Sequence, residues 1–292
     1  TQRFLWPFTR LGETIDLFER SMASTKRILE LLKTTCKITN KDDAIVIKNL
    51  DQNITFKNVD FSYAEKEVFK NLNLEIKKEN FIGIAGQTGS GKSTLIKLLF
   101  RFYEVNSGQI QLDNHNINNI HLESLRSKIG LVNQEIFLFD GTIKENIAYP
   151  NSEIDDVLLM EVAQSSQCLE FIEKLDDGFD TLIGERGQRL SVGQKQRIGI
   201  ARALYKKPEI LIFDEATSSV DNETEYLIQK SLKEISKNCT TLVIAHRLST
   251  IKNANKIIVL GDYKVLEEGT HDDLIENNNF YKHLWDIQTG NN

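Results

Sequence analysis

A glycine-rich loop between a predicted strand and a predicted helix constrains this chain more than any other feature. The strand is a short, nearly unbroken apolar run at residues 81–85, as expected for a buried parallel strand. The loop has the full spacing of a phosphate loop and reads Gly86-Gln87-Thr88-Gly89-Ser90-Gly91-Lys92-Ser93, followed by Thr94. Such glycines let the backbone wrap phosphate oxygens, and a helix from about Lys92 to Tyr103 adds the positive end of its dipole. The sequence therefore predicts a nucleotide-binding site.

Side chains in and beyond this loop have the chemistry of nucleotide hydrolysis. We expect Lys92 to reach the β- and γ-phosphates, Ser93 to ligate Mg²⁺ and Thr94 to support the α- and β-phosphates. Asp214 ends a strongly apolar strand, and Glu215 follows it. Beside a phosphate loop, Asp214 is interpreted as holding Mg²⁺ through water, and Glu215 as the general base that polarises the attacking water. The structural alternative for this acidic pair is a cap on the next helix.

Strand and helix patterns alternate along most of the chain. Residues 54–59 and 72–76 alternate apolar with polar side chains, which predicts antiparallel strands with one solvated face. Further apolar runs predict buried strands at residues 210–213, 241–245 and 256–260. Residues from about 136 to 202 have a mostly helical pattern and predict a separate lobe. The chain is therefore expected to have an α/β core.

Bulk properties narrow the class of protein. The 292 residues carry a formal net charge of −6, which argues against a nucleic-acid partner. No apolar run reaches the length of about 18 residues that a membrane-spanning helix needs. Three widely spaced cysteines predict reduced thiols rather than disulfides or a zinc site. The chain begins at Thr1 rather than Met and shows no signal peptide, so we expect a piece of a longer protein that is soluble as this fragment.

A pentapeptide between the phosphate loop and the strand at residues 210–213 narrows the prediction further. It reads Leu190-Ser191-Val192-Gly193-Gln194, and with the two flanking motifs it resembles the signature of the ATP-binding cassette (ABC) family. The resemblance implies a P-loop NTPase (RecA-like) core with an antiparallel β subdomain and a helical signature subdomain. It also implies a head-to-tail dimer in which Ser191 and the Gly193 N–H of one subunit contact the γ-phosphate of ATP held by the other. Val192 stands at a signature position where the family most often has glycine, and we expect this difference to be tolerated.

The same resemblance gives roles to residues that would otherwise be unremarkable. Gln134 matches the Q-loop, a magnesium and water contact, and His246 matches the switch histidine that contacts the γ-phosphate and orients Glu215. Tyr63 matches the aromatic residue that stacks on adenine. Ser218 to Asp221 matches the D-loop, which crosses the dimer interface. Without the family, these would be a surface glutamine, a turn histidine and a strand-end tyrosine.

Two segments resemble the exporter branch of the family. Residues 1–33 form a predicted amphipathic helix that resembles the cytoplasmic end of the last membrane helix of an exporter. A linker at residues 34–50 and the nucleotide-binding domain at residues 51–288 are expected to follow it. Thr181 to Gly187 resembles the exporter-specific loop that contacts the membrane domains. The resemblance therefore implies a membrane domain fused upstream and a place on the cytoplasmic face of a membrane. A soluble ABC ATPase and an importer cassette are the alternatives, and the transported substrate is not defined by these residues.

Overall fold

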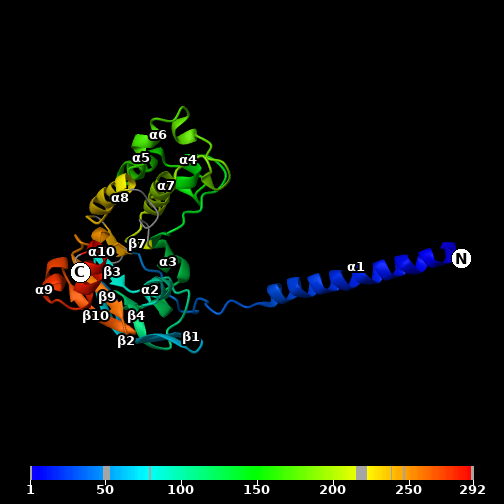
Figure 1. Ribbon diagram of the computed structural model, residues 1–292, viewed down its shortest axis with the longest axis horizontal. Helices are drawn as coiled ribbons and strands as arrows, with labels where there is room; N and C mark the ends of the chain where they lie inside the picture. The colour runs from blue at the N-terminus through cyan, green and yellow to red at the C-terminus, as the bar shows by residue number, and fades with distance from the viewer. Residues whose placement is uncertain are drawn as a thin grey trace. The chain divides into compact units, whose positions relative to one another are not determined.

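The computed structural model describes residues 2–48, 53–78, 80–214, 222–237, 239–245 and 247–290. The chain divides into two compact units, Thr1–Thr39 and Asn40–Asn292. The first unit contains helix α1 (Gln2–Lys33), whose apolar stripe includes Leu11, Ile15, Phe18 and Met22. Among the helices of the described residues, none combines the length and apolar character needed to cross a membrane. The second unit contains both sheets and the remaining helices (Figure 1).

A six-stranded sheet forms the centre of the second unit. Its order is β10-β9-β3-β8-β7-β6, and all neighbours are parallel except the β10–β9 pair. The strands are β3 (Phe81–Gly86), β6 (Ile129–Val132), β7 (Ile210–Asp214), β8 (Thr240–Ile244), β9 (Lys256–Gly261) and β10 (Lys264–Gly269). Because β3, β8, β7 and β6 are parallel and adjacent, their carboxyl ends lie along one edge of the sheet.

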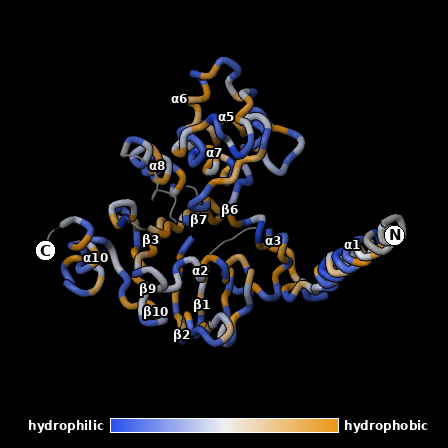
Figure 2. The backbone as a smooth tube through the Cα atoms, turned by 45° about the vertical axis from the view of Figure 1, so that its right-hand side comes forward, coloured by the Kyte–Doolittle hydropathy of each residue, from blue (hydrophilic) through white to orange (hydrophobic). Residues whose placement is uncertain are grey.

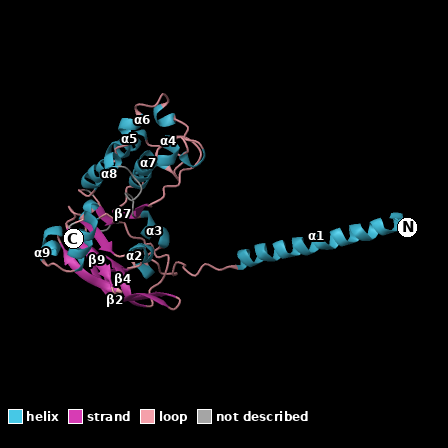
Figure 3. Ribbon diagram, viewed as in Figure 1, coloured by secondary structure: helices cyan, strands magenta, loops and turns pink. Residues whose placement is uncertain are grey.

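A four-stranded antiparallel sheet lies beside this core, as the two alternating segments predicted. Its order is β2-β1-β4-β5, with β1 (Asn53–Tyr63), β2 (Lys66–Lys77), β4 (Ser107–Leu112) and β5 (His115–Asn116). β1 pairs with β2 on one side and with β4 on the other, both antiparallel. This arrangement confirms the mixed α/β fold class, and Figure 3 shows the strands gathered in one part of the second unit.

Side chains that alternate along the parallel strands enter two different cores. Ile210 and Ile212 of β7 belong to a cluster shared with the antiparallel sheet and α2 (Lys92–Leu99), whereas Leu211 and Phe213 face a cluster shared with α8 (Asn222–Ile235). The sheet is thus apolar on both faces, and Figure 2 shows hydrophobic residues concentrated along β3, β6 and β7. Burial on both faces explains why these strands appear in the sequence as continuous apolar runs.

The segment between β6 and β7 is predominantly helical and has its own apolar cluster. Figure 1 shows its helices grouped apart from the strands. Buried members of the cluster include Leu138, Ile147, Ile183 and Ile198. Its helices are α4 (Ile143–Ala148), α5 (Asp156–Ser165), α6 (Leu169–Ile172), η2 (Gly178–Asp180), η3 (Glu185–Gly187) and α7 (Val192–Tyr205). Besides α1, α2 and α8, the described helices outside this lobe are η1 (Ile117–Asn119), α3 (Leu122–Ser127), η4 (Leu248–Thr250), α9 (His271–Glu276) and α10 (Phe280–Thr289).

The helix after the phosphate loop is shorter than its apolar pattern predicts. α2 ends at Leu99, not near Tyr103. Arg101 adopts a left-handed backbone conformation with φ of 50°, and its N–H donates to the Leu98 carbonyl, so the chain turns instead of continuing the helix. The Arg101 side chain is only 2% exposed and donates to the Ile120 carbonyl, a tertiary contact that the local sequence does not reveal.

The three cysteines are free thiols, as expected. Cys168 and Cys239 are buried, and burial raises the pKa of each thiol to about 12. Both are therefore protonated at neutral pH and behave as small apolar side chains.

Replacing Ile84 tests the importance of the central strand. This side chain lies on β3, two residues before the phosphate loop, and is 0% exposed. We expect Ile84→Ala to lower the free energy of unfolding by about 2–5 kcal/mol because it leaves a cavity, and Ile84→Val by about 0.5–1.5 kcal/mol. Denaturant unfolding followed by circular dichroism measures both. Val157→Ala, at a position 70% exposed on α5, is the control and should change stability by less than about 0.5 kcal/mol; an equal loss at this position would contradict the assignment of the core.

Candidate nucleotide-binding site

The phosphate loop leaves β3 through a glycine that no other residue could replace without rearrangement. Gly86 has φ of 148°, and a Cβ built there would lie 2.4 Å from the Leu260 carbonyl oxygen and 2.6 Å from Ser90 Oγ. The strand β9 therefore packs directly against the start of the loop. This close approach bends the chain at Gly86, so that the loop residues enclose a space lined by backbone.

The loop places its lysine ammonium among loop carbonyls. Lys92 is 7% exposed, and its Nζ donates to the Gly86 carbonyl at 2.8 Å and to the Gln87 carbonyl at 3.0 Å. Lys92 is also the first residue of α2, which has no side-chain cap at its N-terminus. The first N–H groups of a helix lack intrahelical partners, so α2 directs donors and a positive dipole end at the same loop.

A buried hydroxyl inside the loop fits an anionic ligand. Ser90 Oγ is buried and has no hydrogen-bond partner among the residues that the structure describes. Buried polar atoms are rarely left without a partner, so such an atom marks a place where a ligand supplies one. Together with the Gly86 bend and Lys92, it makes the loop suitable for phosphate oxygens.

The predicted adenine-stacking residue shares a cleft with the phosphate loop. Tyr63 ends β1, and its hydroxyl lies 3.4 Å from Thr94 Oγ1 of α2. The half-buried ring also packs edge-on against Tyr103, with centroids 5.0 Å apart. A cleft of about 270 Å³ is lined by Tyr63, Lys66, Val68, Thr88, Gly89, Gly91, Lys92, Ser93 and Thr94. The structure thus joins an aromatic face from the antiparallel sheet to the phosphate-binding backbone of the core.

The other predicted site residues follow strands of the same sheet edge. Asp214 is the last residue of β7 and pairs with Ile244, near the end of the neighbouring β8. Gln134 comes two residues after the end of β6, the next strand, and is exposed. Glu215, Ser218, Asp221 and His246 lie outside the described residues. Topology alone brings the phosphate loop, Asp214 and Gln134 to one edge, where ligands of such sheets bind.

The oxygen donors near this edge match the preference of Mg²⁺. Ser93, Asp214 and Gln134 offer a hydroxyl, a carboxylate and an amide oxygen, which are hard ligands. Within the described ranges, no group of three or more His, Cys, Asp or Glu residues could form a metal site by itself. That composition fits a magnesium ion held by a few protein oxygens and by the phosphates of the nucleotide.

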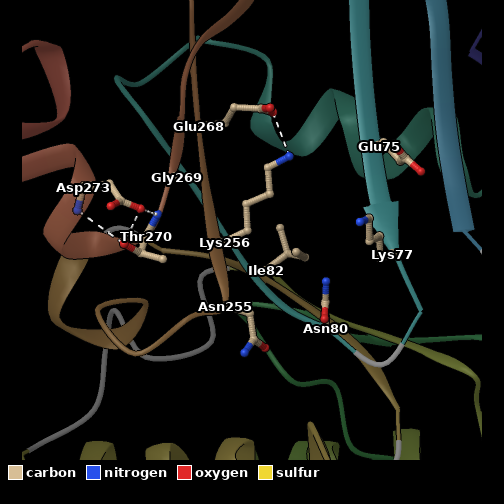
Figure 4. Close-up of a pocket in the computed structure, with 10 residues that line it drawn as sticks. All are labelled: Glu75, Lys77, Asn80, Ile82, Asn255, Lys256, Glu268, Gly269, Thr270 and Asp273. Carbon is tan, nitrogen blue, oxygen red and sulfur yellow. Dashed lines mark hydrogen bonds and ion pairs between the residues drawn. The ribbon is translucent and has the colours of Figure 1, made fainter. Parts of the chain in front are cut away.

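A second cleft, of about 400 Å³, differs chemically from the phosphate loop. Figure 4 shows its lining: Glu75, Lys77, Asn80, Ile82, Asn255, Lys256, Glu268, Gly269, Thr270 and Asp273. Lys256 Nζ lies 2.9 Å from the Glu268 carboxylate, and Asp273 caps its own helix through Thr270. Because Lys256 is paired with a carboxylate and the lining carries three carboxylates, Glu75, Glu268 and Asp273, this cleft has little to offer an anionic phosphate.

The signature residues form the start of helix α7. Ser191 is the N-cap: its Oγ accepts from the Gln194 N–H at 3.2 Å, while Gln194 Oε1 accepts from the Ser191 N–H at 2.9 Å. This reciprocal arrangement is a capping box, so the serine and the glutamine fix the helix start. Val192 is the first helical residue and is 56% exposed. A helical backbone has negative φ, and for this reason valine is accommodated there.

Gly193 is required for a different reason, namely a close approach between two helices. A Cβ at Gly193 would lie 2.5 Å from Thr224 Oγ1 and 2.6 Å from Thr224 Cγ2. Thr224 is 8% exposed and belongs to α8. The signature glycine therefore allows α8 to pack on the first turn of α7.

Comparisons with known proteins identify the family. A model of the ABC transporter family matches residues 69–218. This chain belongs to the ABC transporter family. The chain is 42% identical over 288 residues to an ATP-dependent lipid A-core flippase of Escherichia coli (strain K12), which covers 97% of this chain and 49% of the flippase. It is 39% identical over 289 residues to a putative multidrug export ATP-binding/permease protein of Bacillus subtilis (strain 168), covering 98% of this chain and 50% of that protein.

A solved ABC structure confirms the fold. A bacterial Atm1-family ABC exporter with ATP bound superposes with a TM-score of 0.85 at 36% identity, over 95% of this chain and 49% of that one. This ABC chain therefore spans about half the length of the relatives it matches.

The segment that resembles the exporter loop lies on the helical lobe of this ABC domain. Leu182 is 57% exposed and forms an isolated antiparallel β-bridge with Thr142. Glu185–Gly187 forms the short helix η3. Lys195 of α7 donates to the Arg186 carbonyl at 3.0 Å, which fixes the loop beside the signature helix. The loop is thus an exposed surface held by the element that carries the signature.

Several residues that contact the site residues were not predicted from the sequence. Thr224 and Gln196 look like ordinary polar helix residues, yet Thr224 packs on Gly193 and Gln196 is buried beside Asn133, the neighbour of Gln134. Arg202 also contacts this region, through the Phe137 carbonyl at 2.7 Å. The only hint was the run of polar residues on a helix whose other positions are apolar, a pattern equally typical of a solvated face.

Removing the loop lysine tests the phosphate site. We expect Lys92→Met to weaken ATP binding by about 10- to 100-fold, because one charge-assisted hydrogen bond is worth roughly 1.5–3 kcal/mol. Isothermal titration calorimetry measures the dissociation constant. Lys256→Met, in the second cleft, is the matched control and should leave ATP binding unchanged; a similar loss in both variants would mean that ATP binds elsewhere.

The contact between Gly193 and Thr224 predicts a pair of compensating variants. Gly193→Ala should lower the free energy of unfolding by about 1–3 kcal/mol because the new methyl group overlaps Thr224. Adding Thr224→Ala removes Oγ1 and Cγ2 and should recover part of that loss. Thermal unfolding of the two single variants and the double variant measures the coupling, and strictly additive losses would show that the two residues do not touch.

Proposed function

We propose that this chain is the ATP-binding and ATP-hydrolysing motor domain of an ABC exporter. In this function, ATP-driven dimer closure is coupled to export of a substrate across a membrane. The observation that carries the proposal is the cleft shared by Tyr63 and the phosphate loop, next to a sheet edge that ends in Asp214 and Gln134. The family and the names of the relatives, a flippase and a multidrug exporter, support the direction of transport.

The predicted site residues divide the tasks of the proposed hydrolysis among them. Tyr63 stacks on adenine, the loop backbone and Lys92 bind the phosphates, and Glu215 accepts a proton from the attacking water as general base. His246 contacts the γ-phosphate and orients Glu215, and Gln134 contacts the same water. Ser93, Gln134 and, through water, Asp214 would hold Mg²⁺, which when bound neutralises charge that develops on the phosphate oxygens.

The partner for catalysis is a second nucleotide-binding domain in head-to-tail orientation. Ser191 caps a 14-residue helix that begins with Val192, Gly193 and Gln194, and both Ser191 and Val192 are exposed at this helix start. A helix N-terminus favours an anion, so this end is suited to the γ-phosphate of ATP held by the other copy. The D-loop residues Ser218 and Asp221 would cross the same interface. ATP would then bind both halves only in the closed dimer, which shifts the population toward closure.

The second proposed partner is a membrane domain fused upstream. Exposed aromatic side chains lie near the exporter loop: Phe137, Phe139 and Tyr149 are 54%, 40% and 45% exposed, and their rings contact one another in sequence. The exposed Leu182 forms a β-bridge with Thr142, which lies in the chain between Phe139 and Tyr149, and exposed apolar side chains of this kind are suited to contact with another protein. Helix α1 would be the cytoplasmic end of the last membrane helix. The full protein would then place this domain on the cytoplasmic face of a membrane.

The relatives do not agree on a substrate. Their names specify lipid A-core in one case and multiple drugs in another, although both match nearly all of this chain. The part of the relatives that this chain matches is the ATPase half, so these residues do not identify a class of transported substrate. A soluble ABC ATPase and an importer cassette remain the alternatives, and both would share the ATP site. An importer cassette is expected to lack the exporter loop at Gly184 to Gly187.

Blocking hydrolysis should trap the closed dimer. Glu215→Gln removes the proposed general base while leaving ATP binding intact, so ATP with Mg²⁺ should convert the protein from monomer to dimer. Analytical ultracentrifugation at several protein concentrations measures the change. The same variant combined with Ser191→Ala should dimerise at least about tenfold more weakly, because a contact to a charged phosphate is lost. A Glu215→Gln protein that stays monomeric with ATP at high concentration would contradict the proposed closure.

A further inference from the structure

One face of helix α7 contacts the segment that contains Gln134. The contacts come from Gln196, Gly199 and Arg202, which are spaced by three residues and therefore lie on the same side of the helix. We call these three residues the contact face of α7. They lie on the helix that begins with the signature, and they meet residues 133–137.

Successive residues of the contact face of α7 meet successive positions of the segment 133–137. Gln196 is 3% exposed, and its Nε2 lies 3.4 Å from the Asn133 carbonyl, a long hydrogen bond. At Gly199 a Cβ would lie 2.6 Å from Ile136 Cδ1, so Ile136 fills the space above the glycine. Arg202 Nη1 donates to the Phe137 carbonyl at 2.7 Å. Gln134 therefore lies between contacts to α7 on both sides.

Arg202 also connects this segment to α4. Its Nε and Nη2 donate to the carbonyl and the Oδ1 of Asn146, at 2.7 and 2.8 Å. Asn146 Oδ1 in turn accepts from the Phe139 N–H at 2.9 Å. The guanidinium is thus spread over three acceptors in a fixed geometry, and such planar, multidentate donation is specific to arginine.

We propose that Gln196 and Arg202 are positioning residues that hold the Gln134 segment on helix α7, so that Gln134 and Ser191 shift together. This inference rests on the proposed function, in which Ser191 serves the ATP of the partner and Gln134 serves the ATP of its own subunit. Movement of α7 toward one nucleotide would then move Gln134 relative to the other. The two ATP sites of a dimer would be coupled through one helix.

Hydrogen exchange of the protein without nucleotide tests the contacts directly. Gln196→Met keeps the size of the side chain and removes the donor, so amides at residues 134–137 should exchange about two- to tenfold faster. Lys195→Met is the matched control on the same helix, because its ammonium donates to Arg186 instead. Arg202→Lys keeps the charge and loses the planar fork, and it should accelerate the same amides. Unchanged exchange at residues 134–137 in both variants would overturn the inference.

A double-mutant cycle then distinguishes positioning from a general structural effect. Gln196→Met should raise the Mg²⁺ concentration for half-maximal ATPase rate by about two- to tenfold, with ATP binding measured without Mg²⁺ unchanged. In a Gln134→Ala background the same substitution should have no further effect. An equal effect in both backgrounds would refute a role through Gln134. If Gln134→Ala alone leaves the rate and the Mg²⁺ dependence unchanged, the proposed function of Gln134 fails, whereas the exchange experiment still decides the contacts.

Discussion

The parallel pairing of β3 with β8 and β9 is the constraint on which the rest of the site depends. It aligns Ile84 with Ile244 and with Ile258, and it brings the Leu260 carbonyl so close to Gly86 that only glycine fits. The chain must therefore leave the sheet at Gly86, and the loop forms at the edge where β7 delivers Asp214. Packing stabilises this arrangement of strands, because alternate side chains of the same strands fill the two apolar cores on opposite faces of the sheet. The phosphate site is thus a consequence of sheet register rather than of the loop alone.

Helix α7 links the second half of the proposed site to this core. Its start is fixed by the Ser191–Gln194 capping box, its first turn by Thr224, and its later turns by the Gln134 segment. Each contact is modest, at about 1 kcal/mol for a cap or a neutral hydrogen bond. Together they leave the helix little freedom to slide relative to residues 133–137. Displacement of the lobe as a unit costs fewer of these contacts than displacement of α7 within it.

Local motifs were predicted well because their cause is local. The strand and loop before Lys92 and the antiparallel strands at residues 54–59 and 72–76 each follow from spacing or periodicity over a few residues. Other features depend on partners distant in the chain. The early end of α2 coincides with the left-handed Arg101, whose side chain is buried against the Ile120 carbonyl, and the need for glycine at 193 arises from Thr224. The hydrophobic periodicity of a single segment does not reveal a contact with a residue distant in the chain. Gln196 shows the same limit, since a buried polar side chain cannot be told from a solvated one without its acceptor.

Val192 illustrates how a family pattern and a local structure constrain different atoms. The position is the first of α7, where φ is helical and the side chain is 56% exposed, so a β-branched residue meets no forbidden backbone and remains largely on the surface. Gly193, one residue later, is buried against Thr224 and admits no Cβ. The two adjacent positions therefore tolerate substitution very differently, although the commonest form of the family signature has glycine at both. Within this chain the second position is fixed by packing, whereas the first is open to any residue compatible with a helix start and with the surface of a partner.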